Sequence, residues 1–324
     1  MSDLYVDPAG SYAIQSSDRL VEAWAVEPIR FEGKDRPEWQ NGEDGFVARL
    51  HRGLRSMQPR DDDVLACAFT DPERENPADV ENRLFTNVKE PPWPRAQASR
   101  QPNAFATLPR DIRFERRFVQ AQPPAGMSGG ATVVGYRYAL EPAASQWSGW
   151  QVVGDPLARW DLIEVTGMSD QAAWPTLLAM RRQAAGVRVR HEGPPLAADF
   201  AVRLSLHACR NVQAVTVMES LVDGVVASFQ RERELARAQR VACCLQRRNR
   251  KLAAIPVDEL VAAQVAAPAV LAGSPWAMSP AGTWCQMSPA DRWVVAGALS
   301  VTRTPGATAH RLSGELVRVV PVAG

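Results

Sequence analysis

Short apolar segments bounded by turn-forming or charged residues recur along the chain. Runs of about four to eight such residues are typical of buried or half-buried strands. Strands are therefore predicted at residues 4–6, 23–29, 64–70, 113–120, 132–140, 160–166, 200–206, 293–302 and 312–322. The last two are expected to form a hairpin closed by Pro305-Gly306.

Helical spacing lies between these segments. Apolar residues four positions apart predict a helix over 44–57. Asn76 before Pro77 predicts the start of a helix that runs to about residue 88, because asparagine caps helices and proline fits the first turn. Further helices are expected at 169–186 and, rich in Ala and Val, from 256 to about 271.

The stretch from Val202 to Lys251 begins with an alternating segment and a polar break. Helical periodicity then continues for about thirty residues, apolar at first and strongly basic at the end. It predicts a buried strand that leads into one long helix whose far end meets an anion.

An internal repeat is also predicted. Aligning 65–88 with 202–225 without a gap matches apolar positions, so that Phe69 meets Leu206 and Leu84 meets Leu221. The sequence thus predicts an α+β protein of two duplicated halves, 1–150 and 151–324. Each half would have a small, mostly antiparallel sheet with one or two packed helices, and the second would contain the long basic helix.

Composition indicates a globular chain, since 46% of its residues are hydrophobic and 23% charged. The formal net charge of +1 means that any affinity for nucleic acid must come from a local patch. No apolar run is long enough to span a bilayer, and the first residues lack a signal-peptide pattern. A cytoplasmic protein with five reduced cysteines is therefore expected, with no membrane contact.

Three acidic residues are candidates for catalysis. Asp71, Asp79 and Glu81 lie between a predicted strand end and the start of a predicted helix. Carboxylates so placed can hold Mg²⁺, as a metal-dependent nuclease requires. The alternative is a solvated loop with acids favoured near a helix N-terminus. No cofactor is predicted unless the nuclease hypothesis, with Mg²⁺, holds.

The basic end of the long helix is the candidate nucleic-acid interface. Between residues 230 and 252 there are eight basic residues against two acidic ones. Arginine binds phosphate through paired hydrogen bonds. The candidate contacts are Arg237, Arg240, Arg247, Arg248, Arg250 and Lys251. The alternative is a solvated helix face, which is common where Ala, Arg, Val and Pro are as frequent as they are here.

Other chemistry has little support in the sequence. His207, Cys209, Cys243 and Cys244 lack the spacing of a structural zinc site, so no metal site is predicted. The leading hypothesis is a non-catalytic, nucleic-acid-associated accessory protein, of bacterial type, that contacts a protein partner through Trp- and Pro-rich loops. The alternatives are the nuclease and an enzyme that acts on a small molecule without a readable motif.

Overall fold

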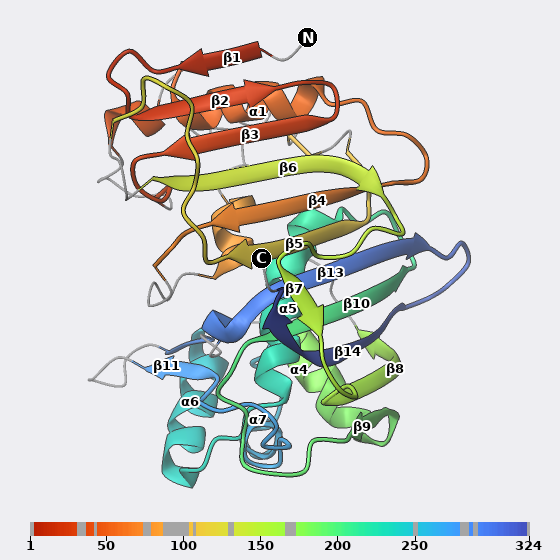
Figure 1. Cartoon of the computed structure of the whole chain (residues 1–324). Helices are drawn as coiled ribbons and strands as arrows, with labels where there is room; N and C mark the ends of the chain where they lie inside the picture. The colour runs from red at the N-terminus through yellow and green to blue at the C-terminus, as the bar shows by residue number, and fades with distance from the viewer. Residues whose placement is uncertain are drawn as a thin grey trace.

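A computed structural model describes residues 3–30, 37–41, 44–73, 79–86, 104–105, 108–128, 133–165, 173–248, 252–278, 285–287 and 291–322. Its main feature is a sheet of strands that runs the length of the molecule (Figure 1). The strands are β1 (Asp3–Val6), β2 (Tyr12–Ser16), β3 (Leu20–Ala25), β4 (Asp63–Thr70), β5 (Ile112–Arg117), β6 (Val134–Pro142), β7 (Trp150–Val152), β8 (Ala158–Val165), β9 (Val187–Val189), β10 (Phe200–Ala208), β13 (Val294–Arg303) and β14 (His310–Pro321). A separate two-stranded sheet pairs β11 (Trp276–Met278) with β12 (Cys285–Met287).

The α+β class is confirmed, but the two predicted sheets are one mixed sheet of twelve strands. Its main path has the order β1-β2-β3-β6-β4-β5-β13-β10-β14-β8-β9, with β7 paired to β14. The halves join where β5 pairs antiparallel with β13 and Phe114 lies opposite Gly297. A β-carbon on Gly297 would lie 2.3 Å from the Phe114 ring, so glycine is needed for this close approach.

Strand pairing follows one scheme on both sides of that junction. β4 is parallel to β5 and antiparallel to β6. β10 is likewise parallel to β13 and antiparallel to β14. Within the described residues, a strand at 63–70 is followed by helical turns at 80–86, as β10 is followed by a helix. Gene duplication is consistent with this pattern and stays a prediction, as does the division into domains at residue 150.

The predicted hairpin of β13 and β14 is wrong, although both strands form. β10 lies between them and pairs with each. Gly306 makes the expected turn with a φ of +81°, but the connection crosses an intervening strand. Alternation of apolar residues predicts where strands form but not which strands pair, because the partner of a strand is set by packing of the whole sheet.

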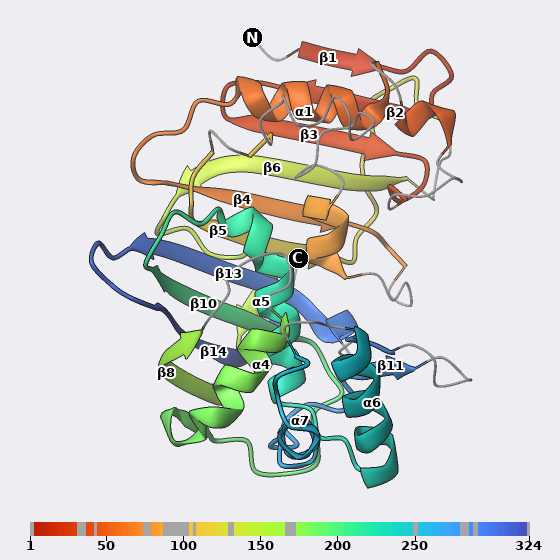
Figure 2. The same ribbon diagram turned by 180° about the vertical axis from the view of Figure 1, so that it is seen from behind.

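Helices cover one face of the sheet (Figure 2). The longer ones there are α1 (Phe46–Ser56), α4 (Ala173–Arg182) and α5 (Ala214–Ser228). The π-helix Asn82–Thr86 and the 3₁₀ turns 38–40, 184–186 and 291–293 are shorter. The main core fills the space between these helices and the strands and extends through both halves. Burial of apolar side chains on this face is the main stabilising contribution to the fold.

The predicted long helix is two helices. α5 ends at Ser228, and α6 (Leu235–Arg248) starts after a buried bend. At the bend the carbonyl of Phe229 accepts main-chain hydrogen bonds from Val270 and Leu271. The Glu232 carboxylate accepts the main-chain N–H groups that precede α6. The prediction of one long helix is therefore wrong: residues 230–234 are all polar, so the apolar stripe of α5 stops at Phe229 and resumes only in α6.

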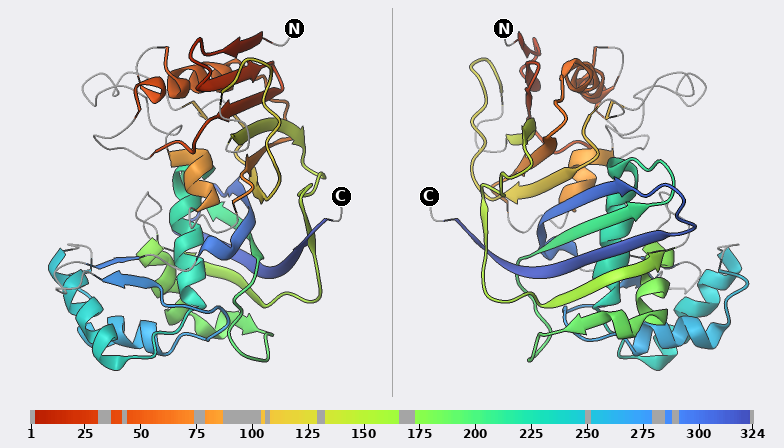
Figure 3. Two further views of the ribbon diagram at one scale, coloured as in Figure 1. Left: turned by 60° about the vertical axis from the view of Figure 1, so that its left-hand side comes forward. Right: turned by 90° about the vertical axis from the view of Figure 1, so that its right-hand side faces the viewer.

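α6 packs with α7 (Val257–Val265) in a lobe at the end of the molecule farthest from the N-terminus (Figure 3). A second apolar cluster holds this lobe to α4. Within it, the rings of Trp174 and Trp276 stack with centroids 4.2 Å apart. Stacked aromatic pairs contribute stability beyond the area that they bury.

The opposite face of the sheet has no described helix over it. β7 and its neighbouring loops cross this face, and so does the connection that follows β5 (Figure 1). There Trp147 and Trp150 form a third apolar cluster with residues of β10, β13 and β14, which covers part of the face near the junction of the halves. The part beyond this cluster, over β10, β14, β8 and β9, is left open, and we call it the open sheet face.

Among the residues that the structure describes, none of the helices combines the length and the apolar character needed to cross a bilayer. All five cysteines are free thiols.

Candidate anion-binding surfaces

The basic residues of α6 do not act as one surface. Arg237 donates a hydrogen bond to the carbonyl of Trp276 and pairs with Glu232 at 3.3 Å, so it holds the lobe together. Arg240 and Arg247 lie on the exposed face of α6. Arg247 bonds to the carbonyl of Cys243, one turn earlier. Two exposed arginines are therefore available to a ligand on the described part of this face.

The remaining basic candidates lie wholly or partly outside the described structure. Arg250 and Lys251 lie outside the described residues, and so does the side chain of Arg248. Their predicted role in binding nucleic acid stays a prediction.

The three acidic candidates have different surroundings. Asp71 is buried and pairs with Arg116 at 3.5 Å, and it also accepts the main-chain N–H of Glu73. Asp79 accepts a hydrogen bond from the Asn82 amide. No group of three or more His, Cys, Asp or Glu among the described residues could hold a metal ion. The helix start predicted at Asn76 lies outside the described residues.

Glu81 is a buried acid at the junction of the halves. Its side chain is almost fully enclosed, and neither carboxylate oxygen has a hydrogen-bond partner within the described structure. Burial raises the pKa of Glu81 well above its usual range, and the nearby carboxylates of Asp79, Asp223 and Glu219 raise it further. Its surroundings therefore disfavour the ionised form that a Mg²⁺ ligand needs.

The loops predicted to contact a protein partner are partly used within the fold. Trp147 donates a hydrogen bond to the carbonyl of Gly297, and Trp150 donates one to the carbonyl of Arg116. Much of the proline-rich connection at 89–109 lies outside the described residues. A protein partner stays a prediction.

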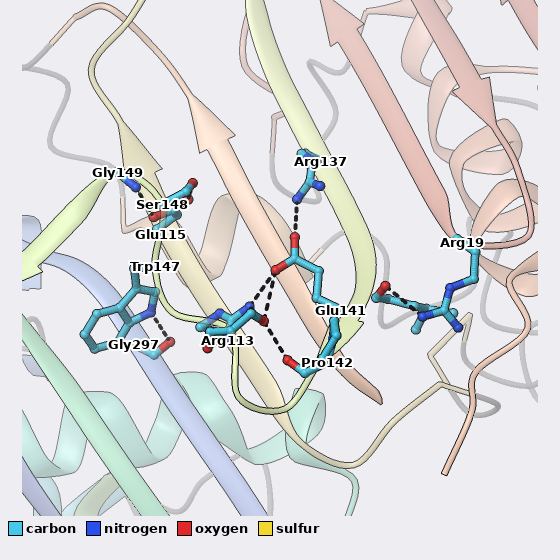
Figure 4. Close-up of polar contacts among 12 residues, drawn as sticks. Arg19, Arg113, Glu115, Arg137, Glu141, Pro142, Trp147, Ser148, Gly149 and Gly297 are labelled. Atoms are coloured by element: carbon cyan, nitrogen blue, oxygen red, sulfur yellow. Dashed lines mark hydrogen bonds and ion pairs between the residues drawn. The ribbon is translucent and has the colours of Figure 1, made fainter. Parts of the chain in front are cut away.

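On the N-terminal part of the sheet, arginines of the same face pair with acids (Figure 4). Arg113 bonds to Glu141 at 2.7 Å, and Arg137 reaches the other oxygen of Glu141 at 2.9 Å. Burial alone would raise the pKa of Glu141, but these two guanidinium groups lower it below its usual value. Glu115 holds Arg117 at 2.6 Å in the same way. These charges are compensated and fasten the connection that leads to β7.

The open sheet face of the C-terminal part is different. Strand register places Arg203 opposite Glu315, Glu315 opposite Arg159, and Arg159 opposite Arg188. Residues that lie opposite one another on neighbouring strands share a face. Four adjacent strands therefore present three arginines and one glutamate in line, and we call these four residues the arginine row.

Glu315 positions two members of this row. Its carboxylate accepts Arg159 at 2.9 Å and Arg203 at 3.0 Å. Arg188 is exposed and has no acidic partner among the described residues. Arg190, just beyond β9, approaches Asp155 only at 3.9 Å, with both side chains largely exposed. Such exposed pairs contribute little, so Arg188 and Arg190 keep most of their positive charge for a ligand.

A hollow of about 600 Å³ lies beside the arginine row. Four arginines and two acids contribute to its lining, namely Arg159, Arg188, Arg190, Arg203, Asp161 and Glu315. Its volume is in the range of small-molecule pockets. A second hollow, of about 230 Å³, adjoins Arg203 on the side of Trp147.

The wall of the larger hollow contains an irregular turn of β8. Between Trp160 and Ile163 this strand has one residue more than β14 opposite it, so it forms a β-bulge. Leu162 there has a φ of +48°, which is uncommon for a residue other than glycine. Its N–H donates to the hydroxyl of Ser313, which in turn donates to Asp161. The bulge thus places Asp161 at the hollow, and it costs some local backbone strain.

No family model, curated protein or solved structure matches this chain.

Sequence reasoning missed the arginine row and the hollow. Its arginines come from three separate strands, β8, β9 and β10, and no local pattern in the chain groups them. Their one shared signal is the repeated polar position of the strands at 158–165, 200–208 and 310–321, which marks a solvated sheet face. That signal says nothing about which strands are neighbours.

Proposed function

We propose that the protein is a non-catalytic, nucleic-acid-associated binding protein and that the arginine row on the open sheet face is its contact surface. One observation supports this proposal above the others. Three arginines lie in register on adjacent strands, on a face that no described helix covers, with one acid between them. Neighbouring strands are about 4.8 Å apart, so the row spans roughly 14 Å and can contact several phosphates.

The physical basis is a local concentration of positive charge, at the arginine row, on a chain that is nearly neutral as a whole. With a net charge of +1, the protein has no general attraction for polyanions. Guanidinium groups held by strands keep their direction better than groups on loops, which lowers the entropy lost on binding. Ser205 and Ser313, on the same face, add neutral hydrogen-bonding groups of the kind that contact phosphate oxygens.

The structure gives the nuclease hypothesis less support. Among its residues, Asp71 is paired with Arg116, and Glu81 is buried with a raised pKa that disfavours its ionised form. No observation on the described residues favours an enzyme that acts on a small molecule over a binding protein.

Salt dependence of binding tests the proposal. Fluorescence anisotropy with a labelled single-stranded oligonucleotide should give a slope of log K against log salt of about −2, since each of three phosphate contacts contributes about −0.7. Replacing Arg159, Arg188 and Arg203 by Gln should remove most of this slope. The matched Lys triple variant keeps the charges and should keep the slope.

The α6 face provides the comparison. A variant with Arg240→Gln and Arg247→Gln should bind as the parent does if the arginine row is the contact surface. Loss of the slope in this variant alone would place the contact on α6 instead. If the parent binds neither single- nor double-stranded DNA or RNA, the nucleic-acid proposal fails. Thermal melting of each variant verifies that the fold is retained.

A further inference from the structure

We infer that the hollow beside the arginine row binds a phosphate monoester. The proposal goes beyond nucleic-acid association, because it concerns one compact dianionic group and not a chain of singly charged diesters. It also does not depend on whether the row contacts a polymer.

Charge at the hollow favours a dianion. Of its four arginines, Arg159 and Arg203 share the single carboxylate of Glu315, so together they retain net positive charge. Arg188 and Arg190 add two more guanidinium groups from the edge strand and the residues just after it, and Asp161 is the second acid among the lining residues. A phosphate monoester carries a charge of about −1.5 to −2 at neutral pH, whereas each backbone diester carries one. The concentration of positive charge at one place therefore suits the monoester better.

Shape supports the same conclusion. Asp161, from the bulge of β8, and Ser313, which donates a hydrogen bond to it, both line the larger hollow. A volume of about 600 Å³ holds a phosphate together with the body of a small molecule. Arginine side chains also offer apolar stems, against which the rest of such a ligand can pack.

Two sources supply this chemistry: a free phosphorylated small molecule, and the 5′-phosphorylated end of a nucleic acid. The experiment separates them. Isothermal titration calorimetry on the full chain uses adenosine 5′-monophosphate and inorganic phosphate as small probes. Anisotropy compares an oligothymidylate that has a 5′-phosphate with the same oligonucleotide that has a 5′-hydroxyl.

Variants at the hollow give changes in opposite directions. Replacing Arg188 and Arg190 by Gln should weaken binding of the nucleotide about tenfold or more, as loss of charge-assisted hydrogen bonds predicts. Glu315→Gln should strengthen it roughly two- to fivefold, because the change removes a negative charge and frees two arginines. A purely structural role of Glu315 would give no gain. Arg311→Gln is the control: Arg311 lies on the same sheet face, opposite His207, outside the hollow.

The pH dependence tests the dianion. The second ionisation of a phosphate monoester has a pKa of about 6, so affinity should fall as the pH decreases from 7.5 to 5.5. The charged groups that face the hollow are Arg188 and Arg190, Arg159 and Asp161 on β8, Arg203 on β10 and Glu315 on β14, and no histidine is among its described lining residues. The decrease should therefore come from the ligand.

The outcomes distinguish the two sources of the phosphate from each other and from the absence of a site. Nucleotide binding that depends on Arg188 and Arg190 supports the site with a small molecule as its source. Tighter binding of the 5′-phosphorylated oligonucleotide, lost in the same variant, supports it with a nucleic-acid end as its source. If neither probe binds at millimolar concentration, or if the double variant binds as the parent does, the inference is overturned. Binding of the 5′-hydroxyl oligonucleotide reports only on the proposed nucleic-acid function.

Discussion

At the scale of single residues, Glu81 illustrates how burial changes the chemistry of a side chain that the sequence marks as a metal ligand. Its acidic identity and its place near a predicted helix start are typical of a catalytic carboxylate. Its burial and the neighbouring carboxylates instead raise its pKa and so disfavour the ionised form. The same residue thus lowers stability whenever the solution favours its ionised form.

Replacing Glu81 by Gln should therefore stabilise the protein at pH 7. The folded pKa is raised above the ordinary value of 4.5, so between that pH and the folded pKa the folded state holds a proton that the unfolded state has released. Stability contributed by this group falls as pH rises through that window, by about 1.4 kcal/mol for each unit of the pKa difference. Glutamine has the same shape and no charge to bury.

Urea unfolding of the parent and the Gln variant at pH 7 and pH 4 measures this effect. The gain should exceed about 1 kcal/mol at pH 7 and vanish near pH 4, where both states are protonated. Glu73→Gln, at an exposed position of the same segment, is the control and should show little change at either pH. An equal gain at both pH values would show that ionisation of Glu81 is not its cause.

At the scale of elements, α6 contains arginines that are identical in the sequence and different in the fold. Arg237 donates a hydrogen bond to the carbonyl of Trp276 and pairs with Glu232. Arg240, three residues later, is exposed to solvent. The difference follows from the direction of each side chain around the helix. A count of positive charge along the helix cannot separate them.

Arg237→Gln should destabilise the lobe of α6 and α7, and Arg240→Gln should not. The first change removes the hydrogen bond to Trp276 and leaves Glu232 with less compensation, at a cost of about 1–3 kcal/mol. The second removes an exposed charge, for which changes within about 0.5 kcal/mol are usual. Hydrogen exchange of α6 amides, followed beside the melting temperature, measures both. Equal protection in the two variants would contradict the structural role of Arg237.

At the scale of the whole molecule, one sheet and one core connect the two predicted halves. β5 and β13 pair across the junction, with Phe114 seated over Gly297. Apolar residues of both halves belong to the same buried cluster. A break between halves would expose a long, apolar strand edge, which folded proteins avoid.

Unfolding of the full chain should therefore be a single cooperative transition. Circular dichroism and tryptophan fluorescence should give the same urea midpoint, which is the usual test of two-state behaviour. Gly297→Ala should lower that midpoint for both signals together, because its β-carbon would meet the Phe114 ring. Two separate transitions would instead support independent domains at 1–150 and 151–324.

The sequence by itself determined where many strands and helices form. The helix at 44–57 and the strands at 64–70 and 200–206 match α1, β4 and β10 closely. These features are local, because side-chain periodicity and capping depend on neighbours in the chain. Even so, β2 was not predicted, and one helix was predicted through the polar residues 230–234, where α5 and α6 are separate.

Only the tertiary structure decided which elements are neighbours, and with that the candidate site. Arg203, Glu315, Arg159 and Arg188 come from strands far apart in the chain and meet through the register of β10, β14, β8 and β9. Strand order depends on packing of the whole sheet and its helices, so no local pattern encodes it. The acidic and basic clusters that stand out in the sequence consist of residues close together in the chain. The residues of the arginine row are close together only in space, because the sheet brings their four strands side by side.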